Sequence, residues 1–245
     1  MRRVWRAKVA AALAVAGTGT AHAQALPTVG VEATTDERRR GLSWSGGDAS
    51  VSADAALAIA GLDVSARIAA LRSSSRHAGA DAVADLTLGT GWNVSGVRLR
   101  ASATGHLFAG ARGGMDYWEV GGDASYTLGP LQVEAGLSLA PDQKAIGGGN
   151  LYLFAGANAG IPATPLTVSA SIGRSTGDDD RLRSDRLRPG GDYTDWRIGV
   201  EHVTGPLTLG VDYVATDLSR RREITAIGDP WNSGDRLLAR VRFGL

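Results

Sequence analysis

Apolar and polar residues alternate along much of this chain with a period of two. Leu99 lies on an apolar parity, for example, and its neighbour Arg100 on a polar one. Successive side chains of a β-strand point to opposite faces, so the pattern predicts strands with one apolar and one polar face. The clearest examples are residues 97–107, 131–139 and 207–215.

The same alternation predicts about twelve strands, most of them about ten residues long. A tilted strand needs about that length to cross the hydrocarbon of a bilayer. After residue 23 the sequence has no apolar run of 18 residues, so it does not predict membrane-spanning helices. The strands are expected at residues 28–36, 48–60, 62–72, 80–91, 94–108, 116–128, 131–140, 149–160, 164–175, 192–203, 206–218 and 236–245.

The apolar faces of the clear strands carry no charged residue, and tight turns alternate with longer polar loops. This rhythm is typical of an antiparallel up-and-down barrel with turns at one rim and loops at the other. A soluble sandwich has no reason to produce it. The predicted fold class is therefore all-β: a transmembrane up-and-down β-barrel of about twelve strands. Turns are expected at 60–62, 91–94, 128–131, 160–165 and 203–207, and loops near 37–47, 73–80, 109–115, 141–148, 176–191 and 219–235.

The C-terminal segment LLARVRFGL (residues 237–245) is an amphipathic strand that ends at the last residue. Hydrocarbon does not tolerate unpaired amides, so this strand must close the barrel against residues 28–36. Closure would bring the inward-facing Arg240 and Arg242 toward Glu32 and Asp212. An aromatic near the end of the strand resembles the signal that outer-membrane assembly machinery reads, although Leu245 replaces the usual terminal Phe.

The N-terminal segment has the pattern of an export signal. Four basic residues precede a short apolar run, and Ala21-His22-Ala23 supplies the small-x-small cleavage site. We therefore expect a signal peptide over residues 1–23 and a barrel domain over 24–245, exported to the outer membrane of a Gram-negative cell. The mature chain would hold 22 basic and 25 acidic residues. Without a basic excess, the composition does not point to a nucleic-acid partner; lipid and small polar solutes are the expected partners.

Charged residues recur on the polar, inward parity of the strands. They could form a salt-bridged wall or line a hydrated pore, and the sequence leaves both interpretations open. Because both signs are present, no ion preference follows. The candidate pore-lining residues are Glu32, Asp54, Arg67, Arg98, Arg100, Glu119, Asp123, Glu134, Arg197, Glu201, Asp212, Arg240 and Arg242.

Aromatic residues are expected at the two membrane interfaces, where amphipathic rings are favoured. Trp92 is predicted in a tight turn, whereas Trp44 and Trp231, in long loops, could stack on sugars. The lipid-facing residues near strand ends are Trp118, Tyr126, Trp196, Tyr213 and Phe243.

Catalytic and metal chemistry have thin support in the sequence. His77 lies near Ser73–Ser75 and Asp81, which permits a triad interpretation, but such sets occur by chance in serine-rich loops. His106 is more simply a lumen or rim residue. Calcium at Asp178–Asp180 is chemically possible, yet the run lacks the spacing of a dedicated site. We predict no enzyme, no cofactor and no metal.

Residues 35–45, TDERRRGLSWS, resemble the TorF-type porins, a proteobacterial outer-membrane family whose first strand ends in a pattern like SDYRFRGISQS. The matching positions are Asp36, Arg38, Arg40, Gly41, Ser43 and Ser45. Similar segments follow in order at 116–126, 138–142, 192–200 and 209–218. The resemblance implies a porin-like barrel with no catalytic residues to transfer. Glu37 and Arg39 replace family aromatics, so the first strand should leave the hydrocarbon near Asp36 or bend there.

These observations favour a porin-like channel that passes small polar solutes or ions by passive diffusion. The alternative is a structural or adhesive surface protein with a plugged barrel and binding loops. A hydrolase that uses His77 or His106 is the third hypothesis. Solute and oligomeric state do not follow from the sequence.

Overall fold

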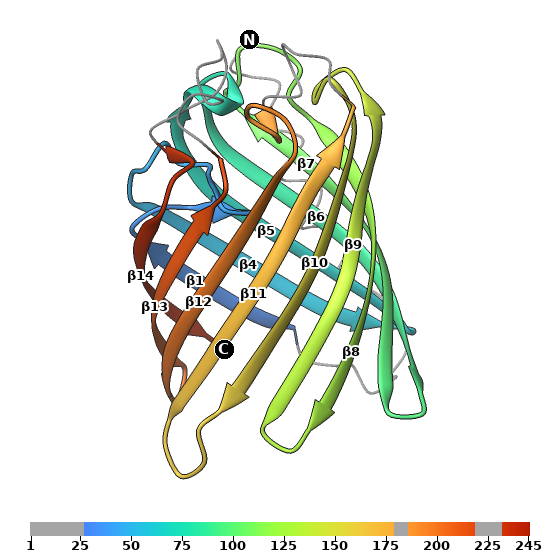
Figure 1. Ribbon diagram of the computed structural model, residues 1–245, viewed down its shortest axis with the longest axis vertical. Helices are drawn as coiled ribbons and strands as arrows, with labels where there is room; N and C mark the ends of the chain where they lie inside the picture. The colour runs from blue at the N-terminus through green and yellow to red at the C-terminus, as the bar shows by residue number, and fades with distance from the viewer. Residues whose placement is uncertain (1–26, 179–185, 219–231) are drawn as a thin grey trace.

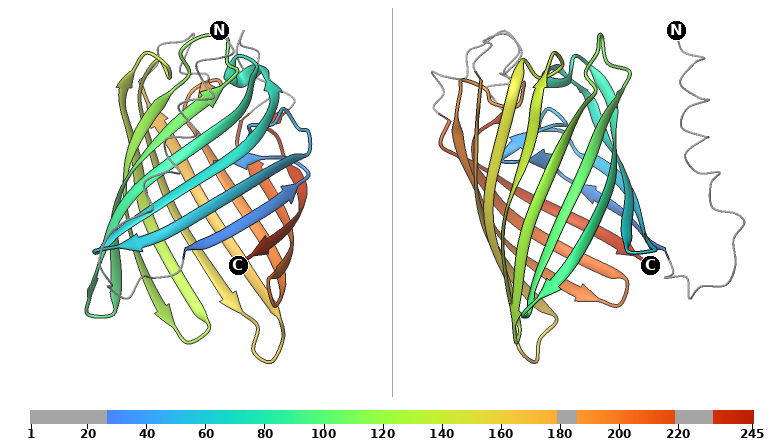
Figure 2. Two further views of the ribbon diagram at one scale, coloured as in Figure 1. Left: turned by 180° about the vertical axis from the view of Figure 1, so that it is seen from behind. Right: turned by 90° about the vertical axis from the view of Figure 1, so that its right-hand side faces the viewer.

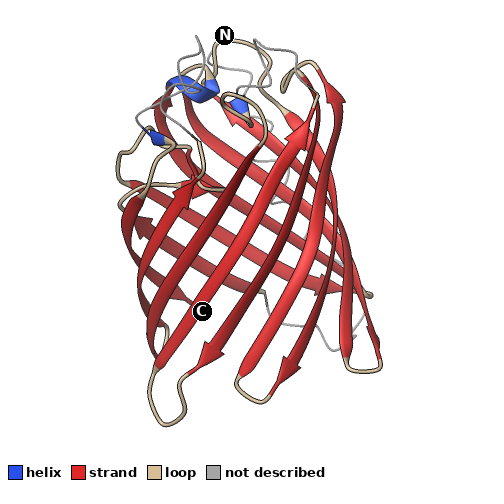
Figure 3. Ribbon diagram, viewed as in Figure 1, coloured by secondary structure: helices blue, strands red, loops and turns tan. Residues whose placement is uncertain are grey.

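Twelve antiparallel strands close into a barrel in the computed structural model, which describes residues 27–178, 186–218 and 232–245 (Figure 1). Almost all of the regular structure is strand (Figure 3). The barrel strands are β1 (Thr28–Thr34), β4 (Ser50–Ile59), β5 (Leu62–Ser74), β6 (Ala80–Val94), β7 (Val97–Ala109), β8 (Tyr117–Leu128), β9 (Leu131–Gln143), β10 (Gly148–Gly160), β11 (Leu166–Gly177), β12 (Tyr193–Thr204), β13 (Leu207–Thr216) and β14 (Arg236–Gly244).

The last strand seals the barrel against the first, as predicted. β14 pairs with β1 from Gly30, opposite Gly244, to Thr34, opposite Arg240. The C-terminal end of the chain consequently lies beside the start of β1 (Figure 2). Closure leaves no sheet edge whose amides would face hydrocarbon unpaired.

All twelve predicted strands are confirmed, with boundary shifts of a few residues. One predicted turn is wrong: β6 and β7 are joined at Ser95-Gly96, not at 91–94. Both residues have positive φ, 51° and 84°, as a two-residue hairpin turn requires. Trp92 therefore lies within β6, opposite Leu99, and its side chain is 52% exposed on the outer wall.

The outer wall is apolar and carries aromatic residues near both rims. At the loop end, Trp118 and Tyr213 are exposed, and Trp196 shares their face. At the turn end, the exposed rings belong to Trp92, Tyr126 and Phe243. This distribution matches the predicted girdles and fits a wall that faces lipid between two interfaces. Among the described residues, no helix is long and apolar enough to span a membrane.

The segment between β1 and β4 departs from the prediction. Residues 37–47 were expected to form an external loop, but they turn into the barrel and form a small hairpin of β2 (Arg38–Arg39) and β3 (Leu42–Ser43). Thr34 and Ser50, which flank this segment, are paired directly across β1 and β4. The wall is thus continuous behind the hairpin. A single 3-10 turn, η1 (Ser75–His77), connects β5 to β6 at the loop end.

Gly136 tests the packing of the interior. A Cβ there would lie 2.6 Å from the carbonyl oxygen of Gly122 and 2.7 Å from the Phe154 ring. We expect Gly136→Ala to lower the free energy of unfolding by about 1–3 kcal/mol through overpacking. Denaturant unfolding in detergent measures the change.

Gly105→Ala is the matched control, because a Cβ at Gly105 on β7 would meet nothing within 4 Å. Its effect should stay within about 0.5 kcal/mol, as for an ordinary surface substitution. Equal stabilities for the two variants would contradict the close packing of Gly136.

Candidate functional site: the interior of the barrel

Charged side chains on the inner wall are joined in pairs across neighbouring strands. Arg240 lies 3.0 Å from Asp212 and 3.8 Å from Glu32, and it also contacts Glu201. The predicted approach of Arg240 to Glu32 and Asp212 is therefore observed. Arg242 instead binds both oxygens of the Asp54 carboxylate, at 2.6 and 2.9 Å.

Other candidate residues extend this ladder around the wall. Arg197 donates to Asp212 at 2.7 Å, and Arg98 lies 3.8 Å from Asp63. Arg100 is opposite Asp123 in the β7–β8 register, and its Nε has no hydrogen-bond partner in the described part of the chain.

Inward-facing glycines give the long side chains room to lie along the wall. A Cβ at Gly210 would lie 2.7 Å from Nε of Arg240, and one at Gly156 would lie 3.3 Å from Glu134. Gly30 has the same relation to Arg242. The glycines of the inner wall thus leave space for the neighbouring charged side chains. The alternation of the sequence alone does not reveal this fit.

The β2–β3 hairpin is organised around one buried carboxylate, Asp36. Its Oδ1 accepts hydrogen bonds from the hydroxyls of Ser43 and Ser45 at 2.5 and 3.0 Å. Its Oδ2 accepts from Nε of Arg38 at 2.8 Å. Burying a carboxylate that is 1% exposed is costly unless donors of this kind satisfy its oxygens. These contacts tie the two arms of the hairpin together.

The hairpin tip reaches side chains on widely separated strands. Arg40 donates to both oxygens of Glu119 on β8, at 3.0 and 2.5 Å. Its guanidinium lies 4.5 Å from the centre of the Tyr152 ring on β10, and its carbonyl accepts a 2.8 Å bond from the Tyr193 hydroxyl on β12. At Gly41, whose φ is 76°, a Cβ would lie 2.5 Å from the Thr216 side chain. The tip therefore crosses the lumen.

The other hairpin face is held by β5 and β6. Arg67 donates to both Glu37 oxygens, at 2.7 and 2.9 Å, and Arg39 lies 2.7 Å from Asp85. Burial alone would raise the pKa of Glu37, but the bonds and charges of Arg67 and Arg39 outweigh it and lower that pKa. For Arg40, burial opposes the charge, yet Glu119 raises its pKa overall. The ion pairs Glu37–Arg67 and Arg40–Glu119 therefore stay charged at neutral pH.

The hairpin explains the motif at residues 35–45. The six matching positions include the carboxylate, both serines, two arginines and the tip glycine of the inserted structure. Glu37 and Arg39, which replace aromatics, face β5 and β6 instead. Of the two expectations for this segment, the chain bends: β1 ends at Thr34 and turns into the lumen.

Above the hairpin, loops and aromatic rings fill the barrel at its loop end. Trp44 is 4% exposed and packs against His77, with ring centres 4.4 Å apart, and against Phe108 at 5.8 Å. Trp44 is thus a core residue, and the expectation that it stacks on sugars from a surface loop is wrong. Trp231 lies outside the described residues.

Three arginines at the loop end are almost fully buried: Arg76, Arg186 and Arg188. Arg76 donates to the carbonyl of Ser43 at 3.1 Å and to the Ser233 hydroxyl at 3.0 Å. We call the buried residues Trp44, His77, Phe108, Arg76, Arg186 and Arg188 the loop-end cluster. Through Arg76, this cluster is connected to the hairpin beneath it.

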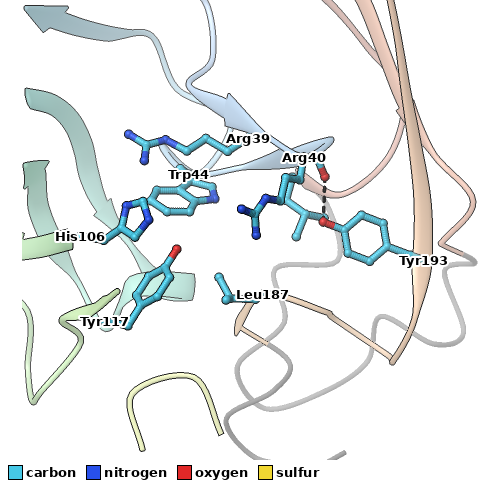
Figure 4. A pocket seen from close by; sticks show the side chains of 8 residues that line it. Arg39, Arg40, Trp44, His106, Tyr117, Leu187 and Tyr193 are labelled. Carbon is cyan, nitrogen blue, oxygen red and sulfur yellow. Dashed lines mark hydrogen bonds between the residues drawn. The ribbon is translucent and has the colours of Figure 1, made fainter. Parts of the chain in front are cut away.

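Two cavities lie on either side of the hairpin. The larger, about 430 Å³, is lined by Arg38, Arg40, Arg67, Arg240 and other charged side chains of the wall. The smaller, about 50 Å³, lies toward the loops (Figure 4). Figure 4 shows Arg39, Arg40 and Trp44 from the hairpin segment facing His106 and Tyr117, with Tyr193 bonded to the carbonyl of Arg40. Of the candidate residues, Arg67 pairs with Glu37 and Glu119 pairs with Arg40, both of the hairpin segment.

The two histidines considered for hydrolysis make other contacts. Nδ1 of His77 accepts from Nε of Arg186 at 3.2 Å, and the Ser73 hydroxyl donates to Asp81. His106 Nδ1 pairs with Asp85 at 2.7 Å. The triad considered for Ser73–Ser75, His77 and Asp81 is not formed by these contacts.

The acidic run considered for calcium is only partly described. Asp178 accepts from the Gly149 amide at 3.1 Å, while residues 179–180 lie outside the described part of the chain. Within the described ranges, no group of three or more His, Cys, Asp or Glu side chains is placed to hold a metal ion.

The closed twelve-strand barrel, with its apolar outer wall and charged interior, has the fold of outer-membrane β-barrels such as the KdgM porin. The sequence matches the family described as "Bacterial protein of unknown function (Gcw_chp)" over residues 19–232, and the chain belongs to this family. No curated protein matches it.

Solved structures share the fold at low identity. The KdgM porin matches with a TM-score of 0.57 and 6% identity, over 88% of this chain and 98% of that one. A membrane protein from a study of in-meso crystallization matches with a TM-score of 0.52 and 14% identity, over 89% and 83%. At these identities the likeness shows the fold alone.

The loop-end cluster should respond to acid before the hairpin does. Burial, followed by the charges of Arg186, Arg76, Arg39 and His106, lowers the pKa of His77 well below 6.5. The packed state therefore binds fewer protons than an opened one, and its stability falls as pH drops below 6.5. The Glu37 pair, with its lowered pKa, is lost only as pH falls below 4.5.

Amide hydrogen exchange of residues 75–79 against pH checks this order. Relative to the intrinsic exchange rate at each pH, the protection of these amides should fall below pH 6.5 in the wild type and stay level in His77→Asn, whose side chain does not titrate there. The same acid response in both proteins would show that His77 is not the titrating group.

Proposed function

We propose that the protein is a porin-like outer-membrane channel in which the β2–β3 hairpin forms the constriction. The cavity of about 430 Å³ on the turn side of the hairpin carries this proposal, because polar walls and that volume suit hydrated small solutes. It supplies a wide vestibule that ends at the hairpin. Small polar solutes or ions would pass by diffusion, limited by the space around Arg40 and Glu119.

Two likenesses support a channel. The KdgM porin shares the fold, and residues 35–45 resemble the TorF-type porins. The proposal includes export by cleavage after residue 23 to a Gram-negative outer membrane, and recognition of the C-terminal strand by the assembly machinery. The thirteen charged candidates would line the path, with Glu119 exposed to solute only where the hairpin moves away from it.

The lumen charges favour weak ion selectivity. The larger cavity is bordered by six arginines and six carboxylates, which balance. A pore with a charged ring of one sign selects ions of the other, and this one has no such excess. We therefore expect similar permeabilities for small anions and cations.

Single-channel recording in planar bilayers tests the proposal. Because Thr34 and Ser50 are already paired, residues 35–49 can be replaced by an Asn-Gly turn that joins β1 directly to β4. We expect small conductance steps for the wild type and steps several-fold larger for this deletion, since the hairpin no longer crosses the lumen.

Arg174→Ala, on the exposed outer wall, is the control and should conduct like the wild type. Folding of each protein is checked by heat-modifiable migration. A folded wild type and a folded deletion that both stay silent would rule out a channel.

A second function is favoured by the packed loop end. Arg76, Arg186 and Arg188 are each at most 2% exposed there, which suits a plugged barrel that presents binding loops. A silent wild type with a conducting deletion would support this structural or adhesive function. Protease shaving of loops 176–191 and 219–235, followed by a cell-binding assay, would then test the loops.

A further inference from the structure

Arg186 differs from the partly buried arginines of the hairpin and the wall. Arg40 and Arg67 bind carboxylates, at 2.5 and 2.7 Å. Arg186 is 2% exposed, and its hydrogen bonds go to neutral acceptors. Its Nη2 has no hydrogen-bond partner in the described part of the chain. A buried cation without a bonded carboxylate is costly, so the surroundings must provide unusually good neutral contacts.

The surroundings form a receptacle shaped for a guanidinium group. Nη1 donates to the carbonyls of Met115 and Ala145 at 2.7 and 3.0 Å, and Nε donates to Nδ1 of His77 at 3.2 Å. The central carbon lies 4.2 Å from the Phe108 ring centre and 5.3 Å from that of Tyr117. These five residues come from four parts of the chain, since Met115 and Tyr117 are close in sequence.

The chemistry of the receptacle favours a planar, weakly hydrated cation. Carbonyl oxygens and an imidazole nitrogen accept in-plane N–H groups, while aromatic faces attract the cation from above. Compact ammonium ions hold their water more strongly and present no flat face. Burial lowers the pKa of Arg186 to about 10, and the carboxylate of Asp116 acts on it only from a distance, since Asp116 accepts from the Phe108 amide.

We infer that this receptacle is a binding site for guanidinium cations and that the chain's own Arg186 fills it, fastening residues 186–191 over the loop-end mouth. Leu187 and Arg188, next in sequence, are buried behind it, at 7% and 2% exposure. Because no carboxylate locks the guanidinium, a free guanidinium compound can compete for the site. The site does not depend on whether the barrel conducts.

The test uses a single introduced cysteine, since the chain has none. Leu187→Cys reports on the fastening of residues 186–191 through its rate of maleimide labelling. Labelling should be slow alone and about tenfold faster with Arg186→Ala, as expected for loss of contacts of this kind. Guanidinium chloride, far below denaturing concentrations, should slow labelling of the Arg186→Ala protein again by filling the vacated receptacle.

Three controls make the result specific. Sodium chloride and tetramethylammonium chloride at equal ionic strength should not slow labelling. Guanidinium should also fail when Phe108→Leu is added to Arg186→Ala, because the aromatic face is gone. If Arg186→Ala does not fold, Arg186→Lys serves in its place with the same additions. Equal labelling with guanidinium and with sodium in the folded variant would overturn the site, whatever the bilayer recordings show.

Discussion

Hydrocarbon offers no hydrogen-bond partners to a peptide backbone, and the rest of this structure depends on that constraint. It requires every strand to be paired, which closes β1 onto β14 and forces the side chains into one apolar and one enclosed set. The enclosed set holds many charges that would be costly if left unpaired. The ion pairs of Arg240 and Arg242, and the hairpin that reaches Glu119 and Arg67, are the ways in which the interior neutralises itself.

The hairpin and the wall depend on each other. Asp36 accepts from four donors, Ser43, Ser45, Arg38 and Arg236, and fixes the shape of the hairpin, while Glu119 and Arg67 fix its position. Above it, Arg76 bonds to the carbonyl of Ser43, so the loop-end cluster rests on the same structure. Two successive structures consequently close the loop end. The hairpin is held by arginine–carboxylate pairs. The loops beyond it are held by the carbonyl oxygens and aromatic rings around Arg186.

The wall was predictable from the sequence, because strand parity is a local property. Alternation located all twelve strands and set the inward direction of Arg240, and closure followed from the membrane. The hairpin was not predictable in the same way. Three consecutive arginines have the pattern of a solvated loop, and their partners are distant: Glu119 lies 79 positions from Arg40. The motif at residues 35–45 marked the right segment without indicating its inward path. Trp92 was misplaced because the turn expected at 91–94 is made by Ser95-Gly96 instead.

The inward path of the chain after Thr34 also sets the length of β1. Its ladder with β14 runs only from Gly30 to Thr34, whereas the ladder between β6 and β7 runs from Ala82 to Val94. The seam where the first and last strands meet is therefore the shortest in the wall. A barrel assembled strand by strand has to close here last, with few backbone bonds to reward the step. The pair of Arg242 with Asp54, which crosses from β14 past β1 to β4, fastens that seam from within.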